Sequence, residues 1–473
     1  MKITVASGFL AALLASLACG LDANPLPQAG TPAPPPAARL PAELAWAEPT
    51  LASAEMPGPV ALPQGLRFPS DNGGGIDASF YFLASPFFSA SEVETFLTGV
   101  RRMAPNRAIV AVLDAPIARA MLKPGKRLGL TLLLARSGPY SPWPRDPMIV
   151  TRDAAGNAVF VARPSLQPGR EMDLFMAPEL AAQLAAFPGP WGRPSWTLAP
   201  MPFHTGQSLA TDTRLWLTVH SVELATLGRL KLSVVPVARF NTPAGLAPYF
   251  EAAMASAADL SRLYGRKGSF VHPWPRGEAE DVALVARLGK GAGFDLDSLL
   301  TLLPGDPEKP PAFVADVAAG RSLLARLSAE DWRSLERTYA LRLDAPGRQA
   351  LASYQDSARA KDLGDFLDLL ASSLVTSGHK VGRLPLLLVP TTSLREVEAA
   401  PEGDFLIGWN NVVITTGAGR AAAEGFASGL PATDLEVAKQ FSDAGVTLNL
   451  LPPLVASVLR NGGYRCASAH LRR

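Results

Sequence analysis

The sequence predicts an α/β fold over residues 76–473. Short apolar segments alternate there with amphipathic helical ones, and the interleaving offers no clear point at which to divide the stretch into domains. Of the 473 residues, 48% are hydrophobic and 18% charged, so the chain can bury a large core. Hairpins mixed with single helices do not match a run of parallel crossover units.

The order of elements follows from hydrophobic periodicity and from turn residues. Helices are expected at 90–103, 245–266, 329–376 and 432–445, where apolar residues recur at helical spacing. A turn at 154–157, Ala-Ala-Gly-Asn, separates two of the expected strands. The apolar, strand-like segments lie at 79–85, 107–115, 127–136, 147–153, 158–164, 214–222, 229–240, 311–320, 383–390, 405–417 and 446–453.

The N-terminal 75 residues are expected to lie outside this fold. Residues 1–19 have one lysine and then an apolar run too short for a membrane span, which is typical of a bacterial export signal. The run ends in Ser-Leu-Ala-Cys, so Cys19 is either lipidated or removed with the signal. Both alternatives predict a protein of the cell envelope, the periplasm or the exterior. Residues 20–75 are rich in Pro and Ala and predict an extended linker.

Charge and motif content exclude several classes of protein. The net charge of +2, from 44 basic and 42 acidic side chains, favours neither nucleic acid nor an anionic membrane, so a membrane is reached only through a lipid at Cys19. No phosphate-binding glycine loop and no Gly-x-Ser-x-Gly motif occurs. No pair of His or Cys residues has metal-ligand spacing, so we expect no metal site.

Cys466 is the first candidate for chemistry. Once Cys19 is lipidated or removed, Cys466 is the single thiol, and an intrachain disulfide is excluded. It follows Asn461-Gly462-Gly463, where the backbone can turn sharply or approach a ligand closely. A buried, structural cysteine is the alternative interpretation. The basic tail after it, with His470, is expected to be solvated.

The segment "NGGYRCASAHLRR" resembles the C-terminus of the guanidino-modifying enzymes of the pentein superfamily, which include arginine, agmatine and peptidylarginine deiminases. In these enzymes a glycine-rich turn presents the nucleophilic cysteine, which implies that role for Cys466. The resemblance implies a pentein-type five-bladed α/β propeller. It also implies a hydrolase that needs no cofactor and acts on a small-molecule or peptidyl guanidine. Calcium, the substrate's identity and the oligomeric state are not readable from the motifs.

Four further segments carry the resemblance. "SPWPRDPMIV" is similar to an Arg-Asp-Pro loop, which implies that Asp146, beside Arg145, binds the substrate guanidinium. "GFDLDSLL" is similar to a His-x-Asp strand, which gives Asp297 the same role. "FHTGQSLATDTRLWL" is similar to the segment with a Glu-Gly-Gly turn. "FLIGWNNVVI" resembles the Asn-containing strand that precedes the final helix.

The sequence departs from the family at two catalytic positions. His204 stands where the family has glutamate, and Asp295 stands where it has histidine. Either the two groups have exchanged places and His204 and Asp295 still form an acid–base pair for Cys466, or the site binds arginine-like ligands without turnover. His272 is the alternative base if the alignment of motifs is shifted.

Each candidate also has a structural interpretation. Asp146 can be a turn residue between prolines, and His204 a hydrogen-bonded loop residue. Asp295 and Asp297 alternate with apolar residues at strand period, so they can lie on a solvated face of a strand. The chemistry nevertheless needs this set together: carboxylates accept the N–H fork of a guanidinium, a thiolate attacks its central carbon, and an imidazole transfers protons.

Overall fold

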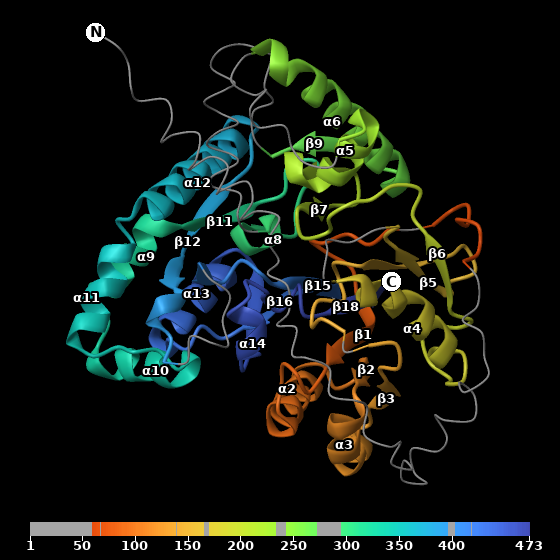
Figure 1. Cartoon of the computed structure of the whole chain (residues 1–473), viewed down its shortest axis with the longest axis horizontal. Helices are drawn as coiled ribbons and strands as arrows, with labels where there is room; N and C mark the ends of the chain where they lie inside the picture. The colour runs from red at the N-terminus through yellow and green to blue at the C-terminus, as the bar shows by residue number, and fades with distance from the viewer. Residues whose placement is uncertain are drawn as a thin grey trace. The chain divides into compact units, whose positions relative to one another are not determined.

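The computed structural model describes residues 59–473, except residues 67, 139, 165–169, 233–242, 272–294, 396–402 and 418 (Figure 1). Cys19 and the alternative base His272 lie outside the described residues. Within the described ranges, no helix is both long enough and apolar enough to cross a bilayer. The described chain divides into two compact units, although the sequence offers no clear dividing point. Unit 1 comprises residues 70–73 and 201–465; unit 2 comprises residues 74–200 and 466–473, together with the described residues before 70.

The described residues of unit 2 form two sheets. The first has the strand order β18-β1-β2-β3, and the second the order β4-β5-β6. Four helices accompany them: α2 (Ala90–Met103), α3 (Ala115–Leu128), the 3-10 helix η1 (Glu171–Phe175) and α4 (Met176–Leu184). The strands are β1 (Ile76–Leu83), β2 (Ala108–Leu113), β3 (Thr131–Leu134), β4 (Met148–Arg152), β5 (Ala158–Ala162), β6 (Ser195–Leu198) and β18 (Ala469–Arg472).

Helix α2 forms where the sequence predicts it. The Ser89 hydroxyl accepts from the Glu92 N–H and the Glu92 carboxylate accepts from the Ser89 N–H, which is a capping box. Val93, Phe96 and Val100 form its buried face. The next helix, α3, was not predicted, because Pro124-Gly125 inside it is ordinarily a break signal.

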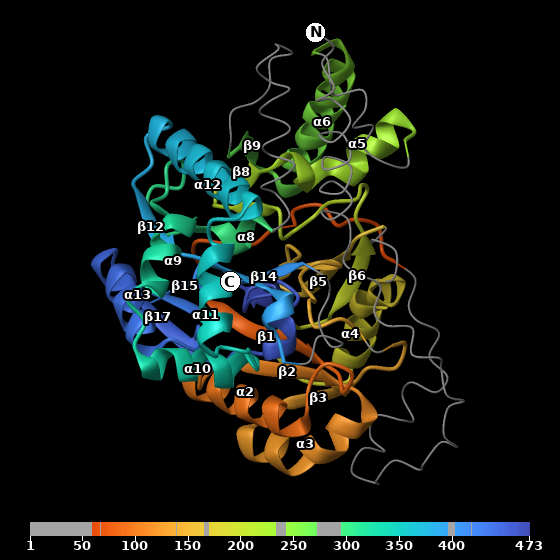
Figure 2. The ribbon, with the colours of Figure 1, turned by 60° about the vertical axis from the view of Figure 1, so that its left-hand side comes forward.

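Unit 1 contains the remaining sheets, which have the orders β7-β8-β9, β10-β11-β12, β13-β14 and β15-β16-β17. Figure 2 shows α12 alongside β12. The strands are β7 (Ser208–Ala210), β8 (Arg214–Leu217), β9 (Lys267–Phe270), β10 (Leu300–Leu302), β11 (Ala312–Asp316), β12 (Val381–Pro385), β13 (Leu387–Pro390), β14 (Asp404–Ile407), β15 (Val413–Gly417), β16 (Arg420–Phe426) and β17 (Val446–Leu451). The helices are η2 (Val219–Val222), α5 (Glu223–Leu230), α6 (Pro243–Tyr264), α8 (Leu296–Leu299), α9 (Val317–Leu324), α10 (Ala329–Tyr339), α11 (Ala345–Tyr354), α12 (Ala358–Thr376), η4 (Thr391–Ser393), α13 (Pro431–Asp443) and α14 (Val455–Val458).

Five of the six sheets in the described residues share one topology. In each, a central strand pairs antiparallel with one neighbour and parallel with the other: β1 with β18 and β2, β5 with β4 and β6, β8 with β7 and β9, β11 with β10 and β12, and β16 with β15 and β17. A parallel partner requires a crossover, and helices supply it in every case. The protein is therefore a mixed α/β fold built from a recurring module.

The structure corrects four expectations. The basic tail is not solvated: β18 is buried, and the Ser79 hydroxyl lies 2.9 Å from His470 Nδ1. The expected linker ends before Phe68, because Phe68, Ser70 and Asn72 are buried.

Two corrections concern internal elements. Residues 229–230 end helix α5 rather than begin a strand, and 233–240 lie outside the described residues. Asp295 and Asp297 lie at the start and inside of α8, not on a strand, since four residues of alternation are too short to fix the period.

Candidate functional site

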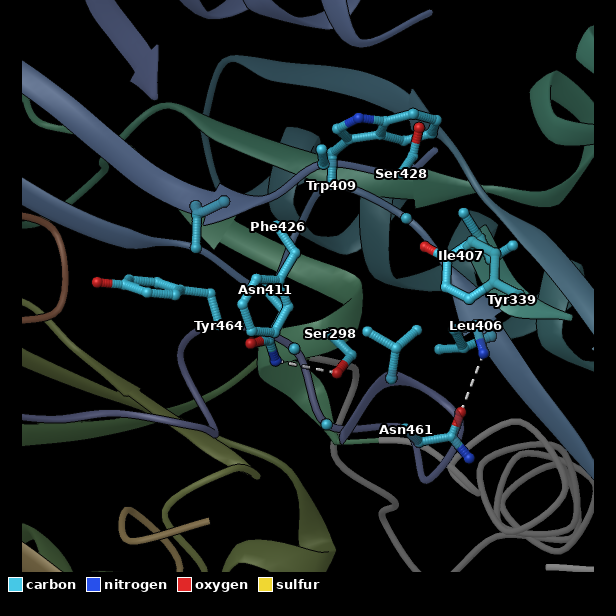
Figure 3. Close-up of a pocket in the computed structure, with 16 residues that line it drawn as sticks. Ser298, Tyr339, Leu406, Ile407, Trp409, Asn411, Phe426, Ser428, Asn461 and Tyr464 are labelled. Carbon is cyan, nitrogen blue, oxygen red and sulfur yellow. Dashed lines mark hydrogen bonds between the residues drawn. The ribbon is translucent and has the colours of Figure 1, made fainter. Parts of the chain in front are cut away.

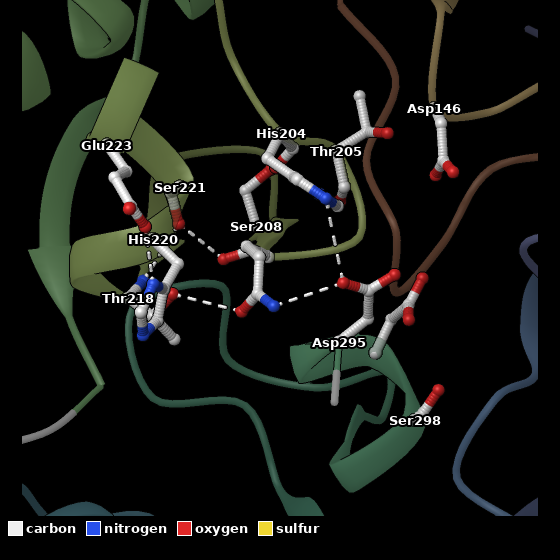
Figure 4. A network of polar contacts seen from close by, with 12 residues as sticks. Asp146, His204, Thr205, Ser208, Thr218, His220, Ser221, Glu223, Asp295 and Ser298 are labelled. Carbon is white, nitrogen blue, oxygen red and sulfur yellow. Dashed lines mark hydrogen bonds and ion pairs between the residues drawn. The ribbon is translucent and has the colours of Figure 1, made fainter. Parts of the chain in front are cut away.

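A turn in unit 1 brings His204 beside Asp295. His204 Nε2 lies 3.8 Å from Asp295 Oδ1, and the two side chains are 19% and 25% exposed (Figure 4). His204 lies before β7, and Asp295 is the residue that precedes α8. The structure thus brings together His204 and Asp295, which were expected to form an acid–base pair. Both remain reachable by solvent.

Gly206 makes this approach possible. The Asp297 N–H donates to the Gly206 carbonyl (3.0 Å), which joins the turn to the first residues of α8. A Cβ atom at position 206 would overlap the Asp295 carboxylate. Any larger residue would therefore push Asp295 away from the turn.

Gln207 holds the Asp295 carboxylate and was not predicted. Its Nε2 donates to Asp295 Oδ1 (3.0 Å), and its Oε1 accepts from the Thr218 hydroxyl (3.1 Å). The Thr218 N–H donates in turn to the Ser221 hydroxyl (2.9 Å), so a buried chain of hydrogen bonds stands behind the carboxylate. Because the Thr218 hydroxyl donates to the amide oxygen of Gln207, the amide nitrogen of Gln207 is the atom that faces Asp295. The only sequence signal was its place in the "FHTGQ" segment.

His220 forms a second acid–imidazole pair on the same network. Its Nδ1 lies 2.7 Å from Glu223 Oε2 (Figure 4). Burial lowers the pKa of His220, but the hydrogen bond and charge of Glu223 and the charge of Asp295 outweigh it and raise the pKa above its ordinary value. His220 is therefore held as a cation over a wider pH range than an exposed histidine.

Asp297 is completely buried and binds a guanidinium group of the chain itself. Arg465 Nη1 donates to Asp297 Oδ2, and Arg465 Nη2 lies 2.9 Å from Asp71 Oδ1. Asn411 joins the two sides: its Nδ2 donates to Asp297 Oδ1 (3.1 Å), and its Oδ1 accepts from the Arg465 N–H (2.7 Å). The carboxylate expected to bind a substrate guanidinium is thus neutralised by Arg465. Neither Arg465 nor Asp71 was predicted from the sequence.

The glycine turn before Cys466 is shaped by close packing. A Cβ at Gly463 would overlap Asn411, and Asn461 adopts a left-handed conformation with φ of 62°. The Asn461 side chain accepts from the Leu406 N–H (3.0 Å) and donates to the Asp404 carbonyl (3.1 Å), which fastens the turn to β14. The glycines therefore allow close approach of backbone, as expected, and the turn ends at Arg465 and Cys466.

Two of the candidate residues lie in unit 2. Cys466 is buried, with 3% of its surface exposed. Asp146 is also buried, in the turn that includes Arg145 before β4, and its Oδ2 lies 2.6 Å from Arg170 Nη1. The second predicted guanidinium-binding carboxylate is thus also engaged by an arginine of the chain.

A pocket in unit 1 opens beside the glycine turn. It encloses about 520 Å³ including its open mouth, and Ser298, Asn411 and Tyr464 line it (Figure 3). Trp409 and Phe426 add aromatic surface, and no charged side chain is among its lining residues. The pocket borders Asn411, which also contacts Asp297, so it is continuous with the surroundings of the site already described.

No protein-family model matches the chain, and no curated protein sequence is significantly similar to it. Solved structures resemble it. The agmatine deiminase of Enterococcus faecalis is 12% identical, with a TM-score of 0.49 over 88% of this chain and 100% of that chain. A provisionally named peptidyl-arginine deiminase is 11% identical (TM-score 0.49; 87% and 99%), and a provisionally named arginine deiminase from Porphyromonas gingivalis is 15% identical (0.47; 86% and 98%). At these identities and TM-scores the likeness says nothing of individual residues.

Proposed function

We propose that this protein is a guanidino-group hydrolase of the deiminase type that acts through Cys466. The observation that carries the proposal is the guanidinium bound by Asp297. That buried carboxylate accepts from Arg465, the residue directly before Cys466 in the chain. The position is therefore suited to a planar, forked cation, since Asp71 supplies a second carboxylate to the same group.

The proposed reaction follows from the residue types. The Cys466 thiolate attacks the central carbon of the substrate guanidinium and forms a C–S bond. His204, as the imidazolium, gives a proton to the departing nitrogen, and the C–N bond breaks with release of ammonia or an amine. A water molecule then adds to the covalent thiouronium and gives one proton to His204. The C–S bond breaks and restores the thiolate, while the new hydroxyl loses its proton to solvent or to the released amine, which leaves a neutral urea group on the product. Asp295, hydrogen-bonded by Gln207, would stabilise the imidazolium.

Substrate binding at Asp297 requires Arg465 to move. One carboxylate cannot hold two guanidinium groups in the same geometry, so the ligand must take the place of the Arg465 side chain. The same holds for Asp146 and Arg170. Both exchanges replace one charged hydrogen-bonded pair by another, so the cost is set by how tightly each arginine is held.

A second candidate function is guanidine recognition without turnover. One observation favours it: both carboxylates expected to bind substrate already hold an arginine of the chain. In that case the protein would bind an arginine-like ligand or a partner without turnover, and Cys466 would be a buried structural thiol.

We also propose the pentein-type five-bladed propeller and export from the cell. The propeller is supported by the five sheets of shared topology. Export through residues 1–19, with or without a lipid on Cys19, and a linker that begins at residue 20 are supported by the composition of the sequence. A small-molecule or peptidyl guanidine is the proposed ligand, with no cofactor.

The labelling rate of Cys466 tests the hydrolase proposal without a known substrate. A chloroacetamidine carries the charge of a guanidinium, whereas chloroacetamide is its neutral counterpart. A hydrolase is expected to react at least about tenfold faster with the amidine, also below pH 8, and Asp297→Asn should abolish the preference. The matched control is Asp356→Asn, which changes an exposed carboxylate of unit 1. Equal, slow labelling by both reagents would support the non-catalytic function.

A further inference from the structure

The guanidinium of Arg170, in unit 2, is surrounded by side chains that accept hydrogen bonds from its nitrogen atoms and by an aromatic ring that covers one of its faces. We call this set the Arg170 cage; it consists of Ser141, Trp143, Asp146 and Asp173. Arg170, Asp146, Asp173 and Ser141 are all buried, with exposed fractions of 8% or less. Of these residues, the sequence analysis named only Asp146.

All three nitrogen atoms of the Arg170 guanidinium have partners in the cage. Nη1 donates to Asp146 Oδ2 (2.6 Å), Nε donates to Asp173 Oδ2 (2.9 Å), and Nη2 donates to the Ser141 hydroxyl (2.8 Å). Nη2 also lies 2.7 Å from Asp173 Oδ2. The ring of Trp143 covers one face of the group, with its centroid 5.2 Å from Cζ. Fork and face are thus both recognised, as in sites built for guanidinium ions.

Much of the cage is held in place without Arg170. The Ser141 N–H and hydroxyl donate to the Asp173 carboxylate at 2.9 and 2.7 Å, and the Asp146 N–H donates to the Trp143 carbonyl (3.2 Å). These bonds fix the Asp173 carboxylate and the turn that carries Asp146 and the indole. Asp173 is further placed by its position in η1. Contacts that do not involve Arg170 therefore hold much of the cage in place.

The charge of the cage demands a cation. Asp146 and Asp173 together carry two negative charges in a buried region, and Arg170 supplies one positive charge. Burial alone would lower the pKa of Arg170, but the two carboxylates raise it, so the arginine is firmly cationic. An ammonium ion would supply the charge but not the planar fork or the stacking face.

We propose that the Arg170 cage is a guanidinium-binding site that Arg170 occupies as an internal ligand, and that an arginine-like ligand reaches Asp146 only by exchange with Arg170. The inference rests on the proposed function only for the ligand class and does not depend on turnover. Because Arg170 is tethered, it competes at a high effective concentration, so the wild-type cage should show no measurable affinity for free guanidinium at low millimolar concentrations.

The variant Arg170→Ala in the full chain tests the proposal. It leaves two buried carboxylates without their arginine, so Tm should fall by several degrees. About 10 mM guanidinium chloride, far below denaturing concentrations, should raise the Tm of this variant again, whereas equal NaCl or urea should not. Half-saturation is expected between about 0.1 and 10 mM, since so small a cation cannot bind tightly. If the variant does not fold alone, its refolding yield with and without guanidinium is the measurement.

Two controls make the outcome specific. Arg152→Ala removes another arginine of unit 2, but its partner Asp77 keeps Arg473, so guanidinium should give no rescue. Arg170→Ala with Asp146→Asn should lose the rescue. No guanidinium effect on Arg170→Ala, or an equal effect on wild type and Arg152→Ala, would overturn the proposal. Measurements in a Cys466→Ala background keep this outcome separate from the labelling test of the hydrolase.

Discussion

At the scale of single residues, burial explains why the candidate carboxylates hold arginines. Asp297 and Asp146 lie in regions from which water is largely excluded, and an isolated buried carboxylate is very costly. Arg465 and Arg170 supply the compensating charge and a matching set of donors. Burial and negative charge would allow these aspartates to bind a guanidine ligand. The same two properties lead them to bind an arginine of the chain, which competes directly with that ligand.

Replacing Arg465 by alanine should destabilise unit 1 strongly. Asp71 and Asp297 would keep their charges without the guanidinium between them, and the loss of one partner of a buried pair costs about 3–5 kcal/mol. Urea denaturation of both proteins measures the difference. Arg321→Ala is the control, because its pair with Asp356 is exposed and should contribute less than about 1 kcal/mol. A loss as small for Arg465→Ala would contradict the buried pair.

The His220–Glu223 pair should make a contribution to the free energy of unfolding that depends on pH. The pKa of His220 is raised in the folded state, so its pair with Glu223 stabilises the fold fully below the unfolded pKa of about 6.5, and this contribution is lost as pH rises through the folded pKa. His220→Gln should therefore lower Tm more at pH 5.5 than at pH 9. The readout is thermal unfolding of both proteins at the two values. An equal decrease at both would show that packing, not charge, is what the histidine contributes.

At the scale of elements, the His204–Asp295 pair depends on two short segments that are hydrogen-bonded to each other. The turn from His204 to Ser208 and the start of α8 are joined by the Asp297–Gly206 hydrogen bond and by Gln207. Neither segment is long enough to hold its own shape. The position of Asp295 relative to His204 is therefore set by their mutual packing.

Gly206→Ala should disturb that packing. The new Cβ would overlap the Asp295 carboxylate, which must then move, so we expect a loss of about 1–3 kcal/mol in stability and a change in the NMR chemical shifts of the His204 imidazole. Chemical denaturation and NMR of the imidazole protons measure the two effects. Gly228→Ala is the matched control: Gly228 lies inside α5 with open space at its Cβ, so alanine should stabilise by up to about 1 kcal/mol. Equal effects of both variants would refute the steric explanation.

The elements also show which parts of the fold and of the site could be predicted from the sequence. The helix at 90–103 and the long helical region after residue 329 were predicted because their apolar spacing and caps are local properties. The meeting of His204 and Asp295 was reached only through motif order. Gln207, Asp71 and Arg465 were missed, because their partners lie up to about four hundred positions away in sequence and no periodicity encodes such contacts.

At the scale of the whole molecule, unit 2 is assembled from distant parts of the chain. Its first sheet places β18 beside β1, with Ile76 opposite Arg472 and Phe80 opposite Ala469. The Arg472 carbonyl also accepts from Arg152 Nε (2.8 Å). Residues 201–465 of unit 1 lie between these strands in sequence, so unit 2 is complete only after residues 469–472 have been synthesised.

Deleting residues 469–473 should therefore unfold unit 2. The deletion exposes one edge of β1 and removes the packing of Leu471, which is fully buried, against a core that includes Phe80. The expected loss exceeds about 5 kcal/mol, the range of a whole domain's stability, and the exposed edge should cause aggregation. Size-exclusion chromatography and near-UV circular dichroism measure both. Deleting Arg473 alone should cost little, because its side chain is largely exposed and contacts Asp77 at the surface. A shortened chain that stays monomeric with wild-type Tm would mean that β18 is dispensable, and that β1 to β6 suffice for this unit.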